Sequence, residues 1–341
     1  MKKKKVLFIS STGGHLNELL QLSPLFEKYD YHIITEKDKT NEYLKEKYGK
    51  KVKYLPYGTR SHLLKYIFIY FYLILKTIYL YILIRPKVIV TTGTHTAGPM
   101  CYLGKIFGSK IIYIETFANI NRKTATGRLI YPIADLFIVQ WEEMLKLYPK
   151  AIYGGSIFWN FELGTVLFSK RNRPQFKKGE IEMILVLLGT QHNEFTRLLQ
   201  EVENCIDNQI IKEQVIVQAG FTKYKSDKME IFDMISKEEL DKYMSKANLI
   251  ITHGGVGSII MALEKGKKVI AVPRLHEYGE HVNDHQRQII KVFSEKKYLI
   301  GIRNVEDLPE AIKESETFEP NEYKNNNQKM LNIIEDFIEK V

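Results

Sequence analysis

Two segments of the chain carry the same pattern, and this pattern restricts the fold more than any other feature. An apolar run at 6–9 leads into the glycine turn 10–15 and then a helix-forming segment, and a run at 249–251 leads into the turn 252–258 and another such segment. A strand, a glycine turn and a helix in this order aim backbone N–H groups and a positive helix end at one point, which suits a phosphate. The repetition predicts two nucleotide-type α/β domains facing each other across a cleft.

Short apolar runs alternate with helical patterns along the chain, which is typical of doubly wound parallel sheets with crossover helices. The runs predicted as strands are 6–10, 31–35, 87–92, 110–114 and 135–139 in the first half, and 183–188, 214–218, 248–252 and 268–273 in the second. We expect a first domain at 1–155, a linker at 156–182, and a second domain at 183–341 that ends in an amphipathic helix.

Charge and cysteine content limit the possible partners. The formal net charge of +10 indicates an anionic partner, which can be nucleic acid, a membrane surface or a phosphorylated substrate. The aromatic residues are concentrated in one apolar segment instead of alternating with basic residues, which argues against nucleic acid. Cys101 and Cys205 are the only cysteines, so neither a disulfide framework nor a zinc site is indicated. The apolar run at 6–10, which follows the basic residues 2–5, is too short for a signal peptide, and we expect a cytosolic chain.

The segment 63–84 is almost entirely apolar or tyrosine. As a helix it would be about 33 Å long, enough to cross a bilayer. A crossing would place the strands at 6–10 and 87–92, which we expect in one sheet, on opposite sides of the membrane. One helical stripe carries Lys65, Tyr72, Lys76 and Tyr79. We therefore expect a helix lying in the interface of an anionic membrane at its cytoplasmic face; the alternative is a buried core helix.

Three positions in the first half are candidates for chemistry. His15 would lie at the carboxyl end of a strand, where ligands bind in open α/β sheets, and an imidazole there can accept a proton from a sugar hydroxyl. The alternative is an incidental exposed histidine at a helix start. The turn 92–99 is rich in small residues that let a ligand approach, or it is a plain turn. Glu115 can orient an acceptor or a base, or it is a solvated loop carboxylate.

The second half carries a denser polar cluster. Arg274 can pair with phosphate, and the Asn, Gln and His side chains of 279–286 can bind base edges and sugar hydroxyls. His281 and His285 have a spacing that suits a metal, but there is no HExxH motif and no third ligand, and no DxD motif is present. The glycine turns are not dinucleotide fingerprints, because neither half has GxGxxG with an acidic residue about twenty positions on. No GxxxxGK[ST] motif is present either, which weakens dehydrogenase and kinase interpretations.

The two halves resemble two subunits of one enzyme type. The first resembles the membrane-associating subunit of the dolichol-pathway UDP-N-acetylglucosamine transferase and its bacterial capsule counterparts, at 10–22, 90–99, 113–118, 126–141 and 148–155. The second resembles the catalytic, nucleotide-sugar-binding partner, at 187–191, 217–220, 251–274 and 279–286. In many relatives the halves are separate proteins, and here they look fused. Both are similar to the GT-B fold shared with MurG, two Rossmann-like domains.

The resemblance implies an inverting, metal-independent glycosyltransferase that moves a hexose from a UDP-sugar to a polyprenyl-diphosphate-linked sugar. It assigns catalysis to His15, with Glu115 as orienting group or substitute base. It assigns the UDP-sugar to Gly189, Thr190, Gln218, Gly220, His253, Gly254, Gly255, Gly257, Ser258, Arg274, Glu280, His281, Asn283, Asp284, His285 and Gln286. It assigns the acceptor to Gly13, Gly14, Thr94 and His95.

One position departs from the dolichol and MurG branches. Relatives there carry a glutamate that contacts the donor ribose, where this chain has Met261. Glu280 or a backbone group is the expected replacement. The segment 279–286 is closer to the bacterial capsule branch, which favours a β-1,4-linked hexose. The alternatives are a UDP-sugar epimerase of the same fold and a non-catalytic membrane-bound partner of another transferase.

Overall fold

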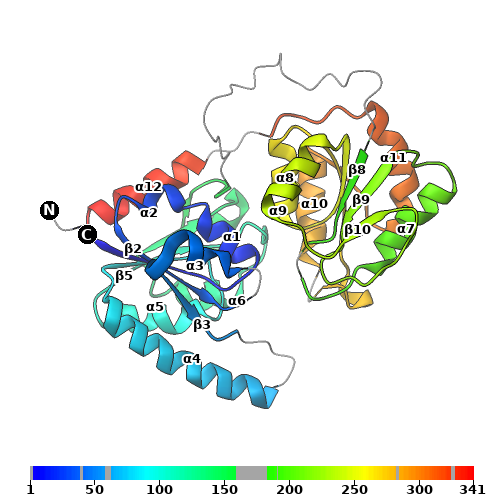
Figure 1. Ribbon diagram of the computed structural model, residues 1–341. Coiled ribbons are helices and arrows are strands. Elements are labelled where there is room, and N and C mark those ends of the chain that lie inside the picture. Colours follow the sequence, from blue (N-terminus) through cyan, green and yellow to red (C-terminus); the bar gives the residue numbers. More distant parts are fainter. Residues whose placement is uncertain are drawn as a thin grey trace. The chain divides into compact units, whose positions relative to one another are not determined.

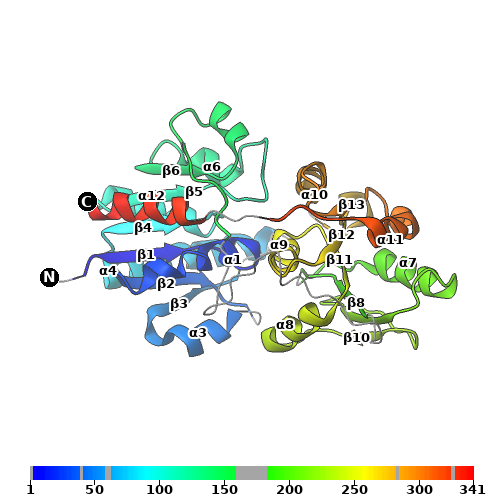
Figure 2. The same cartoon turned by 90° about the horizontal axis from the view of Figure 1, so that it is seen from above.

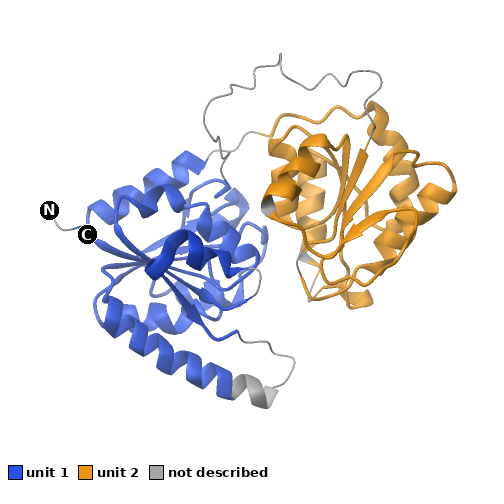
Figure 3. Ribbon diagram, viewed as in Figure 1, with its two compact units in different colours: residues 1–159, 325–341 blue, residues 160–324 orange. Residues whose placement is uncertain are grey.

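The computed structural model describes residues 3–38, 41–57, 63–158, 183–189, 191–281, 284–323 and 327–341, without the side chains at 63–67, 237 and 285. The chain divides into two compact units (Figure 3). Unit 1 comprises residues 1–159 and 325–341, and unit 2 comprises residues 160–324. The predicted linker at 156–182 lies almost entirely outside the described residues.

Unit 1 is built on a parallel sheet (Figure 1). Its seven strands have the order β3-β2-β1-β4-β5-β6-β7. The strands are β1 (Lys5–Ile9), β2 (Asp30–Glu36), β3 (Val52–Leu55), β4 (Val88–Thr91), β5 (Lys110–Ile114), β6 (Leu136–Val139) and β7 (Ile152–Tyr153). The chain runs outward from β1 to β3 and then returns to β4 on the other side of β1. The topological switch point, where ligands bind in such sheets, therefore lies between β1 and β4.

Helices cover both faces of this sheet. They are α1 (Gly14–Leu20), α2 (Ser23–Phe26), α3 (Tyr43–Tyr48), α4 (Leu63–Ile84), α5 (Ala97–Ile106), α6 (Ala125–Ile130) and α12 (Asn327–Glu339). On one face, Leu7 and Ile9 of β1 share a buried core with α4 and α5. On the other, Phe8 packs against Phe26 of α2, with ring centroids 4.6 Å apart.

The carboxyl-terminal helix α12 belongs to unit 1, whereas the sequence analysis placed it in the second domain (Figure 2). Its apolar stripe, which includes Met330 and Ile334, is buried. Gly154 leaves the room that Met330 occupies, because a Cβ at Gly154 would lie 2.8 Å from the Met330 methyl group. The Lys28 ammonium pairs with Glu335 at 2.6 Å. The predicted boundary is therefore wrong at this end, since an amphipathic pattern does not specify which core the helix covers.

Unit 2 is built on a second parallel sheet, in the order β10-β9-β8-β11-β12-β13. The strands are β8 (Met183–Leu187), β9 (Gln214–Gln218), β10 (Glu230–Phe232), β11 (Leu249–His253), β12 (Lys268–Val272) and β13 (Ile300–Gly301), and the helices are α7 (Thr196–Asp207), α8 (Lys237–Lys246), α9 (Val256–Glu264), α10 (His285–Glu295) and α11 (Leu308–Thr317). Its switch point lies between β8 and β11. The nine predicted strands are all present in the two sheets.

Helix α4 buries one stripe and exposes a wide apolar face. Leu73, Leu80 and Ile84 are buried against the sheet. The opposite face exposes Phe68, Phe71, Tyr72, Leu75, Ile78, Tyr79, Ile82 and Leu83. The alternative of a fully buried core helix is therefore wrong. Among the helices that the structure describes, none is long and apolar enough to cross a membrane.

Candidate active site

His15 lies in the first turn of α1, at the switch point of unit 1. Its Nδ1 is 2.7 Å from the Thr92 carbonyl oxygen, and the Thr92 hydroxyl donates to the His15 carbonyl at 2.7 Å. A carbonyl oxygen only accepts, so we assign the ring proton to Nδ1 and the lone pair to Nε2. Desolvation lowers the pKa of His15 below its usual 6.5. The ring is therefore neutral at pH 7, the form that can accept a proton.

Glu115 does not orient His15, contrary to the expectation. Its side chain is only 1% exposed, so it is not a solvated loop carboxylate either. It accepts hydrogen bonds from the Tyr148 hydroxyl at 2.9 Å and the Thr124 hydroxyl at 2.9 Å. Burial raises the pKa of Glu115. Glu115 follows β5, one strand further from the switch point, and its hydrogen bonds stabilise the loop after that strand. The His15 ring is held by the Thr92 carbonyl instead.

Glu18 of α1 is a second buried carboxylate with a structural role, which the sequence analysis missed. It is buried and accepts hydrogen bonds from the Thr116 hydroxyl at 2.6 Å and the Gln140 amide at 3.0 Å. Burial raises its pKa to about 8. Glu18 thereby ties the helix that carries His15 to the loop after β5 and to the end of β6.

The glycines expected at the acceptor site form an open turn. Gly13 has a φ of +73°, and a Cβ added at either Gly13 or Gly14 would meet no atom within 4 Å. Thr94 and His95 follow β4 at the same edge of the sheet. His95 Nε2 lies 3.4 Å from a carboxylate oxygen of Glu36, a residue that the sequence analysis did not single out. The turn at Gly13 and Gly14 therefore leaves open space at the ligand edge of unit 1.

His253 lies at the switch point of unit 2, on the strand β11 that follows the crossover. It is the last residue of β11, and its Nδ1 lies 3.3 Å from the Leu187 carbonyl oxygen at the end of β8. Burial lowers its pKa to about 3, so this ring is also neutral. A Cβ at Gly189 or Gly255 would lie 2.5 Å from its Cε1 or 2.1 Å from its Nε2, respectively. These two glycines make room for the His253 ring.

The remaining residues of the turn divide into packed and accessible positions. A Cβ at Gly254 would lie 2.6 Å from Cβ of Gln286, so this glycine is also required by packing. Gly257 and Ser258 lie in the first turn of α9 and are partly exposed. The helix start that could hold a phosphate is therefore formed by Gly257 and Ser258. Gly254 and Gly255 instead leave room for the side chains of Gln286 and His253.

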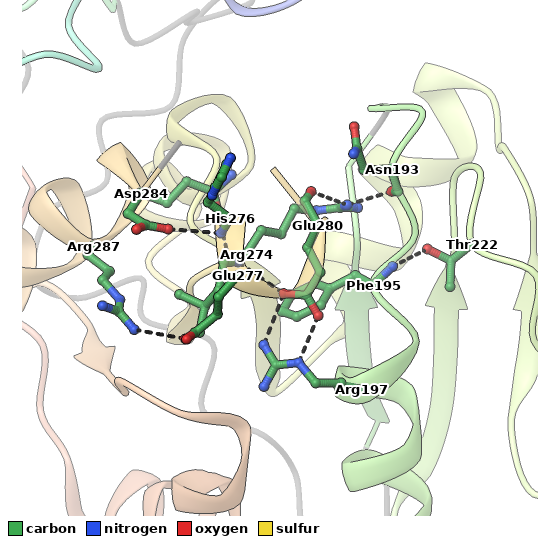
Figure 4. A network of polar contacts seen from close by, with 12 residues as sticks. Asn193, Phe195, Arg197, Thr222, Arg274, His276, Glu277, Glu280, Asp284 and Arg287 are labelled. Carbon is green, nitrogen blue, oxygen red and sulfur yellow. Dashed lines mark hydrogen bonds and ion pairs between the residues drawn. The ribbon is translucent and has the colours of Figure 1, made fainter. Parts of the chain in front are cut away.

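Arg274 is engaged inside the protein rather than free to bind phosphate (Figure 4). Its side chain is 1% exposed, and its guanidinium donates to the carbonyls of Leu188 at 2.6 Å and Asn193 at 2.6 Å. Desolvation lowers its pKa to about 10, so the group remains charged at pH 7. In this structure the guanidinium makes these contacts instead of the expected phosphate contact, and Arg274 braces the loop between β8 and α7.

Glu280 is likewise occupied and does not replace the missing ribose contact. It forms a bidentate ion pair with Arg197 at 2.8 and 2.9 Å and accepts from the Leu275 amide at 3.0 Å (Figure 4). The Gln286 side-chain oxygen accepts from the amides of Gly254 at 3.1 Å and Arg274 at 2.9 Å. These side chains hold the loops at the ligand edge.

The other expected donor residues lie at the same carboxyl edge or close to it. Gln218 ends β9 and is buried, Gly220 follows it, and the His281 ring nitrogen lies 3.0 Å from the Gln191 amide. Asp284 accepts from the His276 amide at 2.9 Å. Thr190 and Asn283 lie outside the described residues, as does the His285 side chain. Met261 is partly exposed on α9. Within the described ranges, no group of three or more His, Cys, Asp or Glu is placed to hold a metal.

Comparison with known proteins assigns a family resemblance to each half. Residues 6–157 match the family "Oligosaccharide biosynthesis protein Alg14 like", and residues 183–341 match "Glycosyltransferase family 28 C-terminal domain". The UDP-N-acetylglucosamine transferase subunit ALG14 of Candida albicans is 43% identical over 77 residues, which is 21% of this chain and 35% of that protein. The mouse subunit is 26% identical over 179 residues, covering 45% of this chain and 82% of that protein.

Solved structures share the fold at low sequence identity. MurG from Acinetobacter baumannii has a TM-score of 0.61 at 14% identity, covering 98% of this chain and 99% of that one. UDP-GlcNAc 2-epimerase from Neisseria meningitidis, bound to UDP-GlcNAc, has a TM-score of 0.69 at 13% identity, covering 99% of this chain and 100% of that one. The chain therefore joins a segment that matches the Alg14-like family to a segment that matches the family 28 C-terminal domain, and its two parallel-sheet units share the GT-B fold.

Proposed function

We propose that the chain is an inverting glycosyltransferase that transfers a hexose from a UDP-sugar to a polyprenyl-diphosphate-linked sugar, with a β-1,4 linkage, in capsular or exopolysaccharide assembly. The observation that carries the proposal is the state of His15: a neutral ring at the ligand edge of unit 1, with its proton fixed on Nδ1 by the Thr92 carbonyl. A polar edge of this kind suits an acceptor hydroxyl, whose proton Nε2 would take.

Unit 2 supplies the donor site in this proposal. The first turn of α9, at Gly257 and Ser258, presents backbone N–H groups and the positive helix end to the UDP diphosphate. His253 lies directly before this turn with a neutral ring. Arg274, Glu280 and Gln286 keep the surrounding loops in place without contacting the nucleotide. The matching family 28 segment at 183–341 supports this assignment.

The proposed reaction is a single displacement. His15 removes the proton from the acceptor hydroxyl, the acceptor oxygen attacks the anomeric carbon, and the bond to the UDP oxygen breaks. The negative charge that develops on UDP is stabilised by the helix start of α9. Chemistry of this type needs no covalent intermediate, so one base and one anion site are sufficient.

The exposed face of α4 supports a membrane-bound acceptor. Its aromatic and aliphatic side chains continue onto Ile106 and Phe107 at the end of α5, which are also exposed. The Phe107 ring contacts Tyr81 of α4, with centroids 5.6 Å apart. An exposed apolar face of this kind suits a monotopic contact with a bilayer at its cytoplasmic face, and the net positive charge of the chain suits anionic lipid.

A donor panel tests the proposed function. The purified chain is incubated with bacterial membrane lipid extract and radiolabelled UDP-galactose, UDP-glucose, UDP-glucuronic acid or UDP-N-acetylglucosamine. We expect label from one donor in the lipid fraction. The absence of lipid-bound label with every donor would contradict the proposal.

Epimerisation is the second candidate, because a UDP-GlcNAc 2-epimerase bound to UDP-GlcNAc shares the fold with a TM-score of 0.69. An epimerase acts on the nucleotide sugar alone and has no need of the exposed face of α4. Incubation with UDP-N-acetylglucosamine without lipid separates the two functions, since only an epimerase would form an isomer.

A further inference from the structure

Three neighbouring strands bring three ionisable residues to the ligand edge of unit 1. Glu36 ends β2, His15 follows β1, and His95 follows β4, in the sheet order β2-β1-β4. Gly93, between the β4 end and His95, lies close to the His15 ring, since a Cβ there would be 3.6 Å from its Nδ1. The sequence analysis placed His15 and His95 at one acceptor site, but it did not single out Glu36, which is distant from both along the chain.

The two histidines of this group have different partners. His15 Nδ1 faces the Thr92 carbonyl, which holds the ring proton on Nδ1, while desolvation favours the neutral ring. His95 Nε2 lies 3.4 Å from the Glu36 carboxylate, and a carboxylate at this distance stabilises an imidazolium with two N–H groups. His95 has a 29% exposed side chain, while that of Glu36 is 2% exposed. The His95 ring can therefore reach a ligand while its carboxylate partner stays inside.

Glu36 is fixed from other directions as well. The Thr96 hydroxyl donates a hydrogen bond to the same carboxylate oxygen. The Asn41 amide donates to the Glu36 backbone carbonyl at 2.8 Å. Burial raises the pKa of Glu36 to about 7, whereas the Thr96 hydrogen bond favours the charged form. A neighbouring cation stabilises a buried carboxylate, and among the described side chains that contact Glu36 the His95 ring can become one by taking up a proton.

We propose that Glu36 positions His95 as a cationic contact for the diphosphate of the lipid-linked acceptor, beside the neutral His15 that takes the proton. This inference rests on the proposed function, because it takes the acceptor to carry a diphosphate. The arrangement separates two tasks between adjacent imidazoles: His95 binds an anion, and His15 acts as base. Glu36 is a positioning residue, since it acts through His95.

Binding of farnesyl diphosphate tests the proposal without requiring turnover. Calorimetry at pH 7 compares the wild-type chain with Glu36→Gln, His95→Gln and the double variant. We expect each single change to weaken farnesyl diphosphate binding about tenfold, with little further loss in the double variant, because both remove the same charged pair. UDP affinity should be unchanged in all three. Unchanged farnesyl diphosphate affinity, or losses that add in the double variant, would overturn the proposal.

Asp135→Asn is the matched control. Asp135 pairs with Lys105 at 2.9 Å and Lys110 at 3.1 Å, directly before β6 and therefore at the opposite, amino edge of the same sheet. Its amide variant loses a comparable carboxylate and should bind farnesyl diphosphate normally. Should Glu36→Gln unfold, the His95→Gln variant decides the question, because its ring is partly exposed.

Kinetics with the lipid-linked acceptor give an independent readout. Glu36→Gln should raise the KM for the acceptor about tenfold and leave kcat nearly unchanged, whereas His15→Gln should lower kcat.

The proposed function and the proposed Glu36–His95 pair would be refuted by different results. A wild-type chain that binds farnesyl diphosphate through the pair but transfers no sugar would refute the proposed function alone. A chain that transfers sugar with an unaltered acceptor KM in Glu36→Gln would refute the pair alone.

Discussion

At the scale of single residues, each unit places a histidine at its switch point, in contact with a backbone carbonyl. His15 follows the first strand of its sheet and has Nδ1 against the carbonyl of Thr92, directly after β4. His253 ends β11, the strand beyond the switch point, and has Nδ1 against the carbonyl of Leu187 in the first strand, β8. The doubly wound topology produces this contact, because the strand after the switch point ends beside the first strand. Desolvation then keeps both rings neutral.

Replacing the proposed base should affect turnover and not donor binding. His15→Gln removes the lone pair of Nε2, and we expect kcat to fall about 100-fold with UDP affinity unchanged. Because desolvation lowers the pKa of His15, the acid limb of kcat/KM in the wild type should lie below pH 6.5. Steady-state kinetics between pH 5 and pH 8 measure both effects. Near-normal turnover in His15→Gln would eliminate this role.

His253 should make stability depend on pH. Its pKa is about 3 in the folded chain, against a usual value of 6.5. The unfolded chain therefore binds the extra proton first, so the contribution of His253 is complete above pH 6.5 and is lost as the pH falls towards 3. At pH 5 the loss should be about 2 kcal/mol. Denaturant unfolding at pH 7 and pH 5 measures it, and His253→Gln should show a smaller difference than the wild type. Equal differences would count against a buried neutral ring.

At the scale of elements, the start of α9 combines packing and binding positions. A methyl group at Gly255 would collide with His253, so Gly255→Ala should lower the free energy of unfolding. Gly257 lies inside the first helical turn, where alanine favours the helix by about 1 kcal/mol over glycine.

The Gly257→Ala variant should therefore fold normally and bind UDP more weakly, because the methyl group enters the space of the diphosphate. Calorimetry with UDP and a thermal melt measure the two properties. Unchanged UDP affinity in a folded Gly257→Ala variant would move the donor site away from this turn.

The exposed face of α4 allows a second test at this scale. Changing Phe68, Phe71, Leu75 and Ile82 to Ser removes exposed apolar area without touching the buried stripe. The variant should sediment less with anionic vesicles and lose activity on a long-chain lipid acceptor more than on a short-chain soluble one. Tyr43 and Ile152, which are exposed elsewhere on unit 1, provide a control pair for change to Ser. Equal losses on both acceptors would indicate damage to the fold.

The sequence predicted elements better than contacts. Long buried strands were recognisable because both faces of a parallel sheet are covered, which gives continuous apolar runs. The short strands β3, β7, β10 and β13 lack such runs and were missed. The glycine turns were predicted from their pattern. Residue type, however, does not distinguish a side chain that binds a ligand from one that forms contacts inside the protein. Arg274 and Glu280 therefore received ligand roles, although both are consumed by internal contacts.

At the scale of the whole molecule, the chain combines two segments that match different families, and it folds into two units. Unit 1 provides the neutral His15 and the exposed face of α4, and unit 2 provides the helix start at Gly257. The carboxyl-terminal helix returns to unit 1, so the chain passes between the units twice. The single-displacement account requires a contribution from each unit: a base for the acceptor and an anion site for the leaving group.

The most direct test of this account is the product formed from the donor that the panel identifies. The wild-type chain is incubated with that UDP-sugar, an α-linked donor, and a purified polyprenyl-diphosphate-linked sugar, and the lipid product is analysed by NMR while released UDP is counted. We expect a β-linked sugar and one UDP per sugar transferred. An α-linked product, or UDP released without a lipid product, would contradict single displacement by His15.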